Sequence, residues 1–323
     1  QGRQVIELSG RVRTYRGLIP MKLPPLTLAT LLLGFYRLEW MASRIPVDEP
    51  WTAKNASWLD ERTVGDWLRS NVPNRSARAM MQVAIEAVFA SHPDDIGLLH
   101  ALYYLKSGGG LERLTSSSGG AQQDRVEGGL QSLAEDWCDW LGEQKVDIFY
   151  EQPVRSVEQS ESGVQVETNA RIFKAKHVIV TVPPALAAEI DFRPPMPSAR
   201  LEWCRAPQNT PYGILLGFIE GREASLWRHK SQDERRQAMV RSFARFFGDQ
   251  AAEPLHYIDY DWTQEVWSRG CYAGVPGPGV TTTVASSARQ PHGRVHWAGT
   301  ETAALWNGYI EGAIRSGIRA AEE

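Results

Sequence analysis

Hydrophobic residues recur at helical spacing from residue 26 to residue 105. Four prolines, at positions 46, 50, 73 and 93, divide this stretch, because a proline ends or kinks a helix. Residues 63–68 have the form of a helix start, and residues 98–105 place leucines and a tyrosine on one apolar face before three glycines. The pattern therefore predicts a series of helices.

Other segments show the patterns of β-strands. Residues 5–15 alternate like strands at the beginning of the chain. Residues 146–150, 154–157 and 164–168 predict a small antiparallel meander. Residues 178–182 form an apolar run that ends in two prolines, which indicates a buried strand of a larger sheet.

Three more elements complete the pattern. Residues 130–141 carry apolar side chains at helical spacing, which predicts a helix that packs in a core. Residues 231–247 form an amphipathic helix whose charged side is a solvated face. Near the C-terminus a strand should end at residues 299–301, and a helix should begin at Gly308 and reach residue 323. Helices and strands together indicate an α/β fold.

Composition narrows the class of protein. The chain has 323 residues, of which 42% are hydrophobic and 23% charged, so we expect a soluble protein of one large or two medium domains. A net charge of −3 argues against a nucleic-acid partner. The three cysteines are far apart and show neither metal spacing nor a disulfide framework, which fits a reducing compartment.

The chain shows no secretory signal peptide, and its first residue is glutamine rather than methionine. The apolar run at residues 26–36 is shorter than the roughly 20 residues that a membrane span needs. We therefore expect a buried helix there, with a membrane-surface patch as the alternative.

Two segments near the C-terminus carry the strongest chemical signal. Residues 296–313 read HWAGTETAALWNGYIEGA, and residues 267–272 read WSRGCY. The two segments resemble the flavin motifs of the flavin-dependent amine oxidases, the monoamine oxidase family. The resemblance extends over almost all of the chain. It implies an FAD-binding flavin amine oxidase fold, with an interleaved substrate domain built of helices and a mixed sheet.

The resemblance also implies a reaction. In this family FAD accepts a hydride equivalent from the carbon beside an amine, and the imine is hydrolysed to aldehyde and ammonia. Dioxygen reoxidises the flavin and gives hydrogen peroxide. The implied partners are therefore a small-molecule amine and dioxygen. No C-terminal membrane tail follows the last predicted helix, so we expect a cytoplasmic, bacterial protein, with a homodimer as a further expectation.

Tyr272 and Tyr309 match the two sides of the family's aromatic cage, and Gln122 matches a polar residue of its cavity. Two aromatic faces can steer an amine and polarise its nitrogen through their π quadrupoles. Taken alone, a tyrosine is more often a core or rim residue, and a single glutamine is more often a solvated loop residue.

The resemblance assigns further positions to the flavin. The N-terminus of the last helix carries partial positive charge and free N–H groups, which suits the negative charge of a reduced flavin. Gly308 would allow backbone and ring to approach closely. Cys271 matches the position that forms a thioether to flavin in some family members, although a cysteine is often just a small buried residue. The cofactor-binding candidates are Val154, Trp262, Cys271, Gly299, Thr300, Glu301, Gly308 and Ile310.

The sequence departs from the family in two places. It contains no G-x-G-x-x-G, whose glycines and helix N-terminus hold the FAD pyrophosphate, and no matching acidic residue for the ribose. A second gap lies between residues 196–200 and 213–218, and no lysine occurs between Lys176 and Lys230, although the family has one there that holds a water against the flavin. We therefore expect a fragment with an internal deletion that cannot bind FAD tightly. Residues 178–182 should be left with an unpaired strand edge, which favours aggregation.

The resemblance divides the chain into alternating parts. Residues 1–10 would be a remnant of an N-terminal FAD domain, and residues 126–198 and 266–323 further parts of that domain. Residues 11–125 and the internally deleted 199–265 would form the substrate domain.

Other functions stay open at this point. An L-amino-acid oxidase would need an arginine for the substrate carboxylate, and Arg113 and Arg125 are candidates, although both read as ordinary surface residues. A carotenoid-type desaturase and a non-catalytic, degenerate remnant also stay open. The sequence does not indicate which amine is the substrate.

Overall fold

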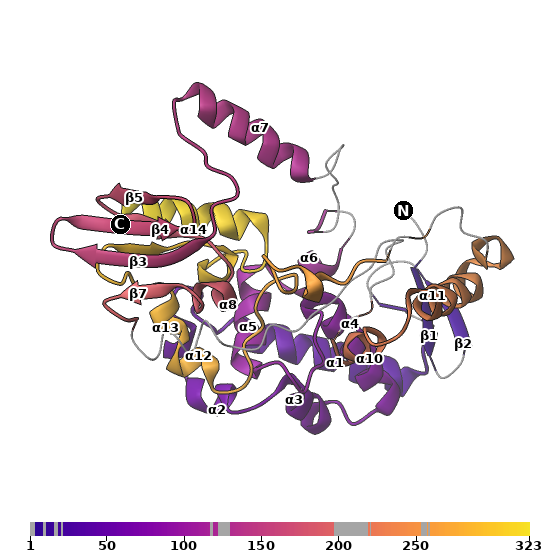
Figure 1. The fold of residues 1–323 in the computed structure, drawn as a ribbon. Coiled ribbons are helices and arrows are strands. Elements are labelled where there is room, and N and C mark those ends of the chain that lie inside the picture. The colour runs from indigo at the N-terminus through magenta and orange to yellow at the C-terminus, as the bar shows by residue number, and fades with distance from the viewer. Residues whose placement is uncertain are drawn as a thin grey trace.

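A layer of helices forms the larger part of the molecule (Figure 1). The computed structural model describes residues 4–8, 11–15, 19–20, 22–116, 119–121, 130–196, 219, 221–252, 257 and 259–323. The predicted helical series is confirmed, and its members are α1 (Pro25–Ala42), α2 (Ala56–Asp60), α3 (Val64–Asn71), α4 (Arg75–Phe89), α5 (Leu98–Ser107) and α6 (Leu111–Thr115).

Local sequence explains where these helices begin. The Thr63 side chain accepts a hydrogen bond from the backbone N–H of Asp66 (3.0 Å), and the Asp66 carboxylate accepts one from the backbone N–H of Thr63 (3.1 Å). This reciprocal pair satisfies two N–H groups that have no partner inside the helix. In α5 every side chain except that of Lys106 is buried, so this helix forms the centre of the helical core.

The expected helix at residues 26–36 is confirmed, but it is buried on one face only. Leu31 and Leu38 of α1 are buried, but Leu26, Leu33 and Tyr36 on its other side are exposed. One face of α1 packs on α4 and α5, and the other faces solvent. Among the described residues, no helix is both long and apolar enough to cross a lipid bilayer.

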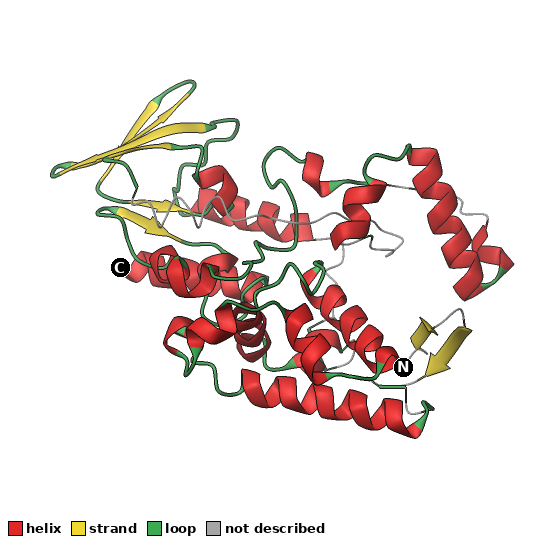
Figure 2. Cartoon of the chain, turned by 90° about the horizontal axis from the view of Figure 1, so that it is seen from below, coloured by secondary structure: helices red, strands yellow, loops and turns green. Residues whose placement is uncertain are grey.

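A four-stranded sheet lies at one end of the molecule, far from the antiparallel pair of β1 (Gln4–Leu8) and β2 (Arg11–Tyr15) (Figures 1 and 2). The alternation predicted strand structure at these residues. Its strand order is β5-β4-β3-β7, with β7 parallel to β3 and the other pairs antiparallel. The strands are β3 (Val154–Ser160), β4 (Gly163–Thr168), β5 (Ile172–Ala175) and β7 (Asp191–Arg193).

The meander was predicted with one wrong strand. Residues 146–150 form no strand, because no described strand pairs with them, and their side chains are exposed. The third strand is β5, which pairs with β4 through Phe173 and Val166. The period-2 pattern of residues 146–150 could not show whether a neighbouring strand exists to pair with them.

A second small sheet joins β6 (Val178–Val180) to β8 (Val295–Trp297) in parallel. Val180 and Trp297 are buried in a second core with Val157 and Phe192. In the described part of the chain, β8 is the only strand that pairs with β6. Ile179 is 42% exposed and Val182 is 41% exposed, so the expected open edge with apolar surface is confirmed.

Helix α7 (Leu130–Glu143) projects away from the rest of the molecule (Figure 1). The expected core packing of its apolar side is wrong, because Leu133, Trp137 and Trp140 are about half exposed. Helical periodicity defines the apolar side of a helix but not whether another element covers it.

The remaining elements follow residue 219. They include the predicted amphipathic helix, which begins after a capping box between Ser231 and Glu234. The helices after residue 219 are α10 (Gly221–Trp227), α11 (Gln232–Phe247), α12 (Val280–Thr283), α13 (Ala285–Ala288) and α14 (Ile310–Glu322). Helix α8 (Pro184–Ala187) lies earlier in the chain, between β6 and β7.

Candidate active site

The C-terminal motif folds as strand, loop and helix, as the sequence predicted, with α14 beginning at Ile310. Gly299 follows β8 with a φ of +123°, and its backbone N–H donates to the Ser316 hydroxyl (2.9 Å). The Thr300 hydroxyl donates to the backbone carbonyl of Tyr309 (3.0 Å). These two bonds hold the loop at residues 299–301 against both the start and the middle of α14.

The N-terminus of α14 has no side-chain cap. Tyr309 occupies the N-cap position, but its side chain makes no capping hydrogen bond. The first N–H groups of a helix have no partner within the helix, and they carry the positive end of its dipole. Ile310, the first residue of the helix, is 49% exposed. This end of α14 can therefore accept a negatively charged group from outside.

Tyr309 lies in a cluster of aromatic rings. Its ring meets that of Trp306 edge to face at a centroid distance of 5.3 Å and that of Tyr104 at 6.3 Å. Tyr104 comes from α5 and is only 6% exposed, whereas Tyr309 is partly buried. The helical core thus reaches the start of α14 through Tyr104.

Tyr272 comes from the other motif and is 43% exposed. A cis peptide bond joins it to Cys271, a feature that the sequence did not predict. Tyr104 interacts electrostatically with both Tyr272 and Tyr309. The backbone N–H of Gly274 also donates to the Glu301 carboxylate (3.3 Å). The structure therefore brings the segments 267–272 and 296–313 together.

The environment shifts the pKa of three groups here. Burial raises the pKa of Glu301, and hydrogen bonds from its own backbone N–H and that of Gly274 oppose the shift. Burial is also the main cause that raises the pKa of Tyr104 well above its usual value. Burial raises the pKa of Tyr309 as well, and the interaction with the Tyr104 side chain opposes that shift.

Gly308 has a structural role that the sequence did not reveal. Its φ is +84°, a region that side chains other than glycine rarely adopt. A Cβ atom at this position would lie 2.6 Å from the Tyr104 hydroxyl oxygen. The space that a side chain would need is therefore filled by Tyr104.

The remaining candidates for binding the flavin or the substrate come from other segments of the chain than the aromatic cluster at Tyr309. Cys271 is partly buried and forms no disulfide. Trp262 is 40% exposed and stacks edge to face on Tyr260 at 4.9 Å. Val154, at the start of β3, lines an open pocket of about 700 Å³ together with Trp267. Gln122 and Arg125 lie outside the described residues.

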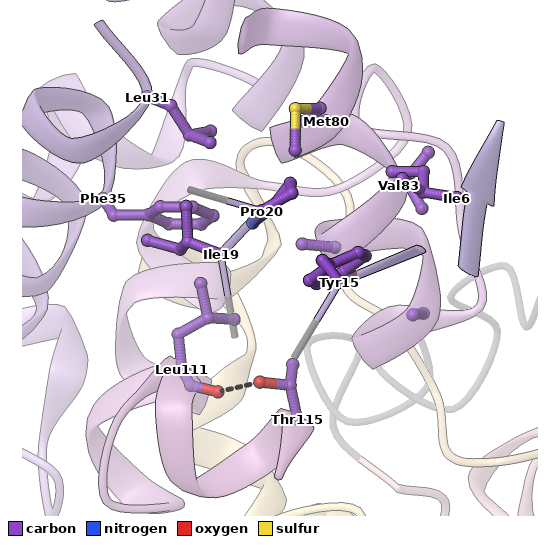
Figure 3. A pocket seen from close by; sticks show the side chains of 12 residues that line it. Ile6, Tyr15, Ile19, Pro20, Leu31, Phe35, Met80, Val83, Leu111 and Thr115 are labelled. Atoms are coloured by element: carbon purple, nitrogen blue, oxygen red, sulfur yellow. Dashed lines mark hydrogen bonds between the residues drawn. The ribbon is translucent and has the colours of Figure 1, made fainter. Parts of the chain in front are cut away.

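An apolar cavity of about 190 Å³ lies in the helical part of the molecule, and no sequence pattern predicted it (Figure 3). Its lining comes from the N-terminal hairpin, the loop after it, α1, α4 and α6, which are far apart along the chain. None of the described residues that line it is charged. The lining residues are Ile6, Tyr15, Ile19, Pro20, Leu31, Phe35, Met80, Val83, Ala84, Ala87, Leu111 and Thr115.

Helix α6 connects this cavity to the C-terminal motif. Leu111 and Thr115 line the cavity, and the Thr115 hydroxyl donates to the Leu111 carbonyl (2.8 Å). Arg113, between them, places its guanidinium carbon 4.8 Å from the centre of the Trp306 ring. Arg113, which an amino-acid oxidase could use to bind the substrate carboxylate, therefore makes a cation–π contact with Trp306.

Comparisons with known proteins agree with this arrangement. The family model described as "Flavin containing amine oxidoreductase" matches residues 11–213 and 198–323. The putative flavin-containing monoamine oxidase AofH of Mycobacterium tuberculosis is 37% identical over 368 aligned positions, which cover 100% of this chain and 78% of that protein. Amine oxidase A of Bos taurus is 30% identical, with 99% of this chain and 69% of that protein covered.

The solved structure of cyclohexylamine oxidase from Brevibacterium oxydans has the same fold. It superposes with a TM-score of 0.90 at 26% identity and covers 99% of this chain and 80% of that one. Family model, relatives and fold agree over nearly the whole sequence. The chain therefore belongs to the flavin-containing amine oxidoreductases, a family of FAD-dependent oxidoreductases.

Proposed function

We propose that this protein oxidises an amine to an imine with FAD and dioxygen, yielding aldehyde, ammonia and hydrogen peroxide. One observation carries the proposal: the backbone N–H of Gly274 donates to the Glu301 carboxylate, which joins the segment of Tyr272 to the segment of Tyr309 with the uncapped start of α14. Two aromatic side chains from separate motifs are thus proposed to lie near a helix end that suits an anionic group. Tyr272 and Tyr309 are proposed to guide the amine, with Gln122 as a further cavity residue.

The residues present fit the ring end of FAD. The uncapped N-terminus of α14 leaves backbone N–H groups available at Ile310. The loop at Gly299 is hydrogen-bonded to the same helix through the Ser316 hydroxyl. When bound, FAD supplies the acceptor for the hydride equivalent. The residues proposed to hold the cofactor are Val154, Trp262, Cys271, Gly299, Thr300, Glu301, Gly308 and Ile310.

The protein's own part in the reaction is to bind, orient and exclude water. The aromatic faces of Tyr272 and Tyr309 attract the amine nitrogen, which fixes the position of the adjacent carbon. Trp306 covers one side of Tyr309, and its edge-to-face contact limits the movement of that ring. No protein acid or base has to be invoked for these roles.

The residues that hold the cofactor phosphates are not found among residues 1–323, because the sequence contains no G-x-G-x-x-G. An internal gap is also supported. The AofH alignment has 368 positions for 323 residues, so at least 45 positions of that relative have no counterpart here. The two matches to the family model overlap at residues 198–213, all of which lie outside the described residues. We propose that residues 1–323 bind FAD weakly.

The domain division is proposed on the same basis. The helical core and the core around Val157 and Trp297 are separate clusters of buried residues. The buried residues of the helical core all lie within 11–125, and those of the other core lie within 126–198 and 266–323. We propose that 11–125 belongs to a substrate domain, with 199–265 as its second part, and that 126–198 and 266–323 belong to a flavin domain, with 1–10 as its remnant. A cytoplasmic location and a homodimer stay predictions.

The cavity supports a substrate with an apolar tail. Its lining contains aliphatic and aromatic side chains, a tyrosine and a threonine, and no carboxylate. A second ammonium group or a substrate carboxylate would enter this cavity without a charged partner, which costs several kcal/mol. A monoamine with an aryl or alkyl tail fits better than a diamine or an amino acid.

A peroxide assay tests this function. Residues 1–323 are incubated with FAD in excess and with benzylamine, hexylamine, putrescine or leucine. We expect peroxide from the two apolar monoamines and little from the other two. Peroxide mainly from leucine would favour an amino-acid oxidase. No peroxide from any substrate at saturating FAD would favour a non-catalytic remnant.

A further inference from the structure

Helix α14 directs two polar side chains toward the loop that follows β8. Ser316 and Arg319 are three residues apart, so they lie on the same face of the helix. The Ser316 hydroxyl accepts a hydrogen bond from the backbone N–H of Gly299 (2.9 Å) and donates one to the backbone carbonyl of Ala313 (2.7 Å). Ser316 is buried. A hydroxyl on the buried face of α14 therefore holds the loop at Gly299.

The Arg319 guanidinium binds the same loop on both sides of Gly299. Its Nη1 donates to the backbone carbonyl of Thr302 (2.9 Å), and its Nη2 donates to the backbone carbonyl of Trp297. Nη2 also donates to the Thr302 hydroxyl (3.4 Å), which in turn donates to the backbone carbonyl of Gly299 (2.9 Å). One side chain of α14 thus connects the last residue of β8 with the far end of the loop.

The contacts of Arg319 require an arginine and not only a positive charge. Its Nε lies 3.0 Å from the Glu323 carboxylate, on the same helix. A guanidinium presents its N–H donors in a fixed planar fork, so it can bind two carbonyls and a carboxylate at once. A lysine ammonium is a point charge on a flexible stem and cannot reproduce this arrangement.

We infer that Arg319 and Ser316 are positioning residues that fix the loop at residues 298–302 relative to the N-terminus of α14. The loop contains three residues proposed to bind the flavin, at positions 299–301, and the start of the same helix is proposed to accept its negative charge. A ligand that contacts both parts binds more tightly when their relative position is fixed beforehand. The inference rests on the proposed function for the identity of the ligand.

Residue-resolved amide hydrogen exchange of residues 1–323 without FAD tests the positioning. The backbone N–H groups of Thr302 and Ala303 donate to carbonyls within the loop, so both should exchange slowly in the unaltered chain. In Arg319→Lys we expect both amides to exchange about tenfold faster, the effect of losing roughly one hydrogen bond from a charged donor. Other bonds still hold the loop, such as that from the Arg289 guanidinium to the Ala303 carbonyl, so the variant should stay folded.

Ser316→Ala is the second variant, and Arg315→Lys is the matched control. Ser316→Ala removes the acceptor of the Gly299 N–H, so that amide should exchange faster although Arg319 is intact. Arg315 forms an exposed ion pair within α14 (2.7 Å), and its replacement should leave the loop unchanged. Unchanged exchange at residues 299–303 in Arg319→Lys would overturn the inference. Equal acceleration in β3 and β4 would also overturn it, because the variant would then be destabilised as a whole.

An FAD titration tests the consequence for the cofactor. The change in flavin fluorescence as residues 1–323 are added gives the Kd. We expect Arg319→Lys to raise the Kd for FAD about tenfold and Arg315→Lys to leave it unchanged. An unchanged Kd in Arg319→Lys despite faster loop exchange would overturn the inference. If the unaltered chain binds no FAD but the loop amides respond as expected, the positioning of the loop stands and the proposed function fails.

Discussion

Replacing Tyr309 by leucine is expected to lower kcat/KM for benzylamine about 30-fold. An aromatic face in a desolvated site attracts a cationic or polarised nitrogen by about 2 kcal/mol. Each 1.36 kcal/mol lost from transition-state stabilisation lowers the rate tenfold. Tyr309 is partly buried between Trp306 and Tyr104, so leucine would remove the aromatic face from a largely desolvated position.

The measurement is a peroxide assay at saturating FAD with two comparison variants. Tyr309→Phe keeps the ring and loses only the hydroxyl, so we expect a loss of a few-fold. Tyr36→Leu removes an exposed tyrosine of α1 and should have no effect. Equal activities of Tyr309→Leu and the unaltered chain would show that Tyr309 is not a cage residue.

Acid is expected to destabilise this protein through one histidine. His100 lies in the middle of α5 and is completely buried beside Phe89, Tyr103 and Tyr104. Burial lowers its pKa from 6.5 to about 4. The folded state therefore keeps His100 neutral at a pH where the unfolded chain already binds a proton.

The sign of the effect follows from these values. The stabilising contribution is fully present above pH 6.5 and is lost as the pH falls through the folded pKa of about 4. The loss amounts to roughly 3 kcal/mol, because one pKa unit corresponds to about 1.4 kcal/mol. Urea unfolding curves recorded by circular dichroism at pH 7.5 and pH 4 give the loss of unfolding free energy for each variant. The contribution of His100 is the difference between the losses of the unaltered chain and of His100→Gln.

The comparison needs a control because many groups titrate over the same range. His229→Gln removes an exposed histidine after α10 and should leave the pH dependence unchanged. His100→Gln should reduce the loss of unfolding free energy between the two pH values by about 3 kcal/mol. Parallel pH profiles for His100→Gln and the unaltered chain would rule out His100 as the source of acid sensitivity.

The sequence predicted best those features that depend on neighbouring residues. The capped start of α11 after Ser231 and the strand, loop and helix of residues 295–322 have local signals, and the structure has them where they were expected. The family motifs also led to Tyr272 and Tyr309. The hydrogen bond from the Gly274 backbone N–H to the Glu301 carboxylate joins the two segments that carry these tyrosines.

The sequence failed where the answer depended on a distant partner. Tyr104 was not among the predicted site residues, because its contact with Gly308 joins residues about 200 positions apart. The apolar side of α7 was expected in a core, yet Trp137 is half exposed because burial requires a covering element. The cavity bounded by Tyr15 and Phe35 was not predicted for the same reason.

The most direct test of this account is a visible absorption spectrum of the polypeptide 1–323 after incubation with FAD and gel filtration, repeated on its acid precipitate. The account predicts that the flavin bands are lost on gel filtration, because the motif that holds the phosphates is not among these residues. Stoichiometric flavin in the protein fraction would contradict it. Flavin that also stays with the acid precipitate would show covalent attachment and would point to Cys271.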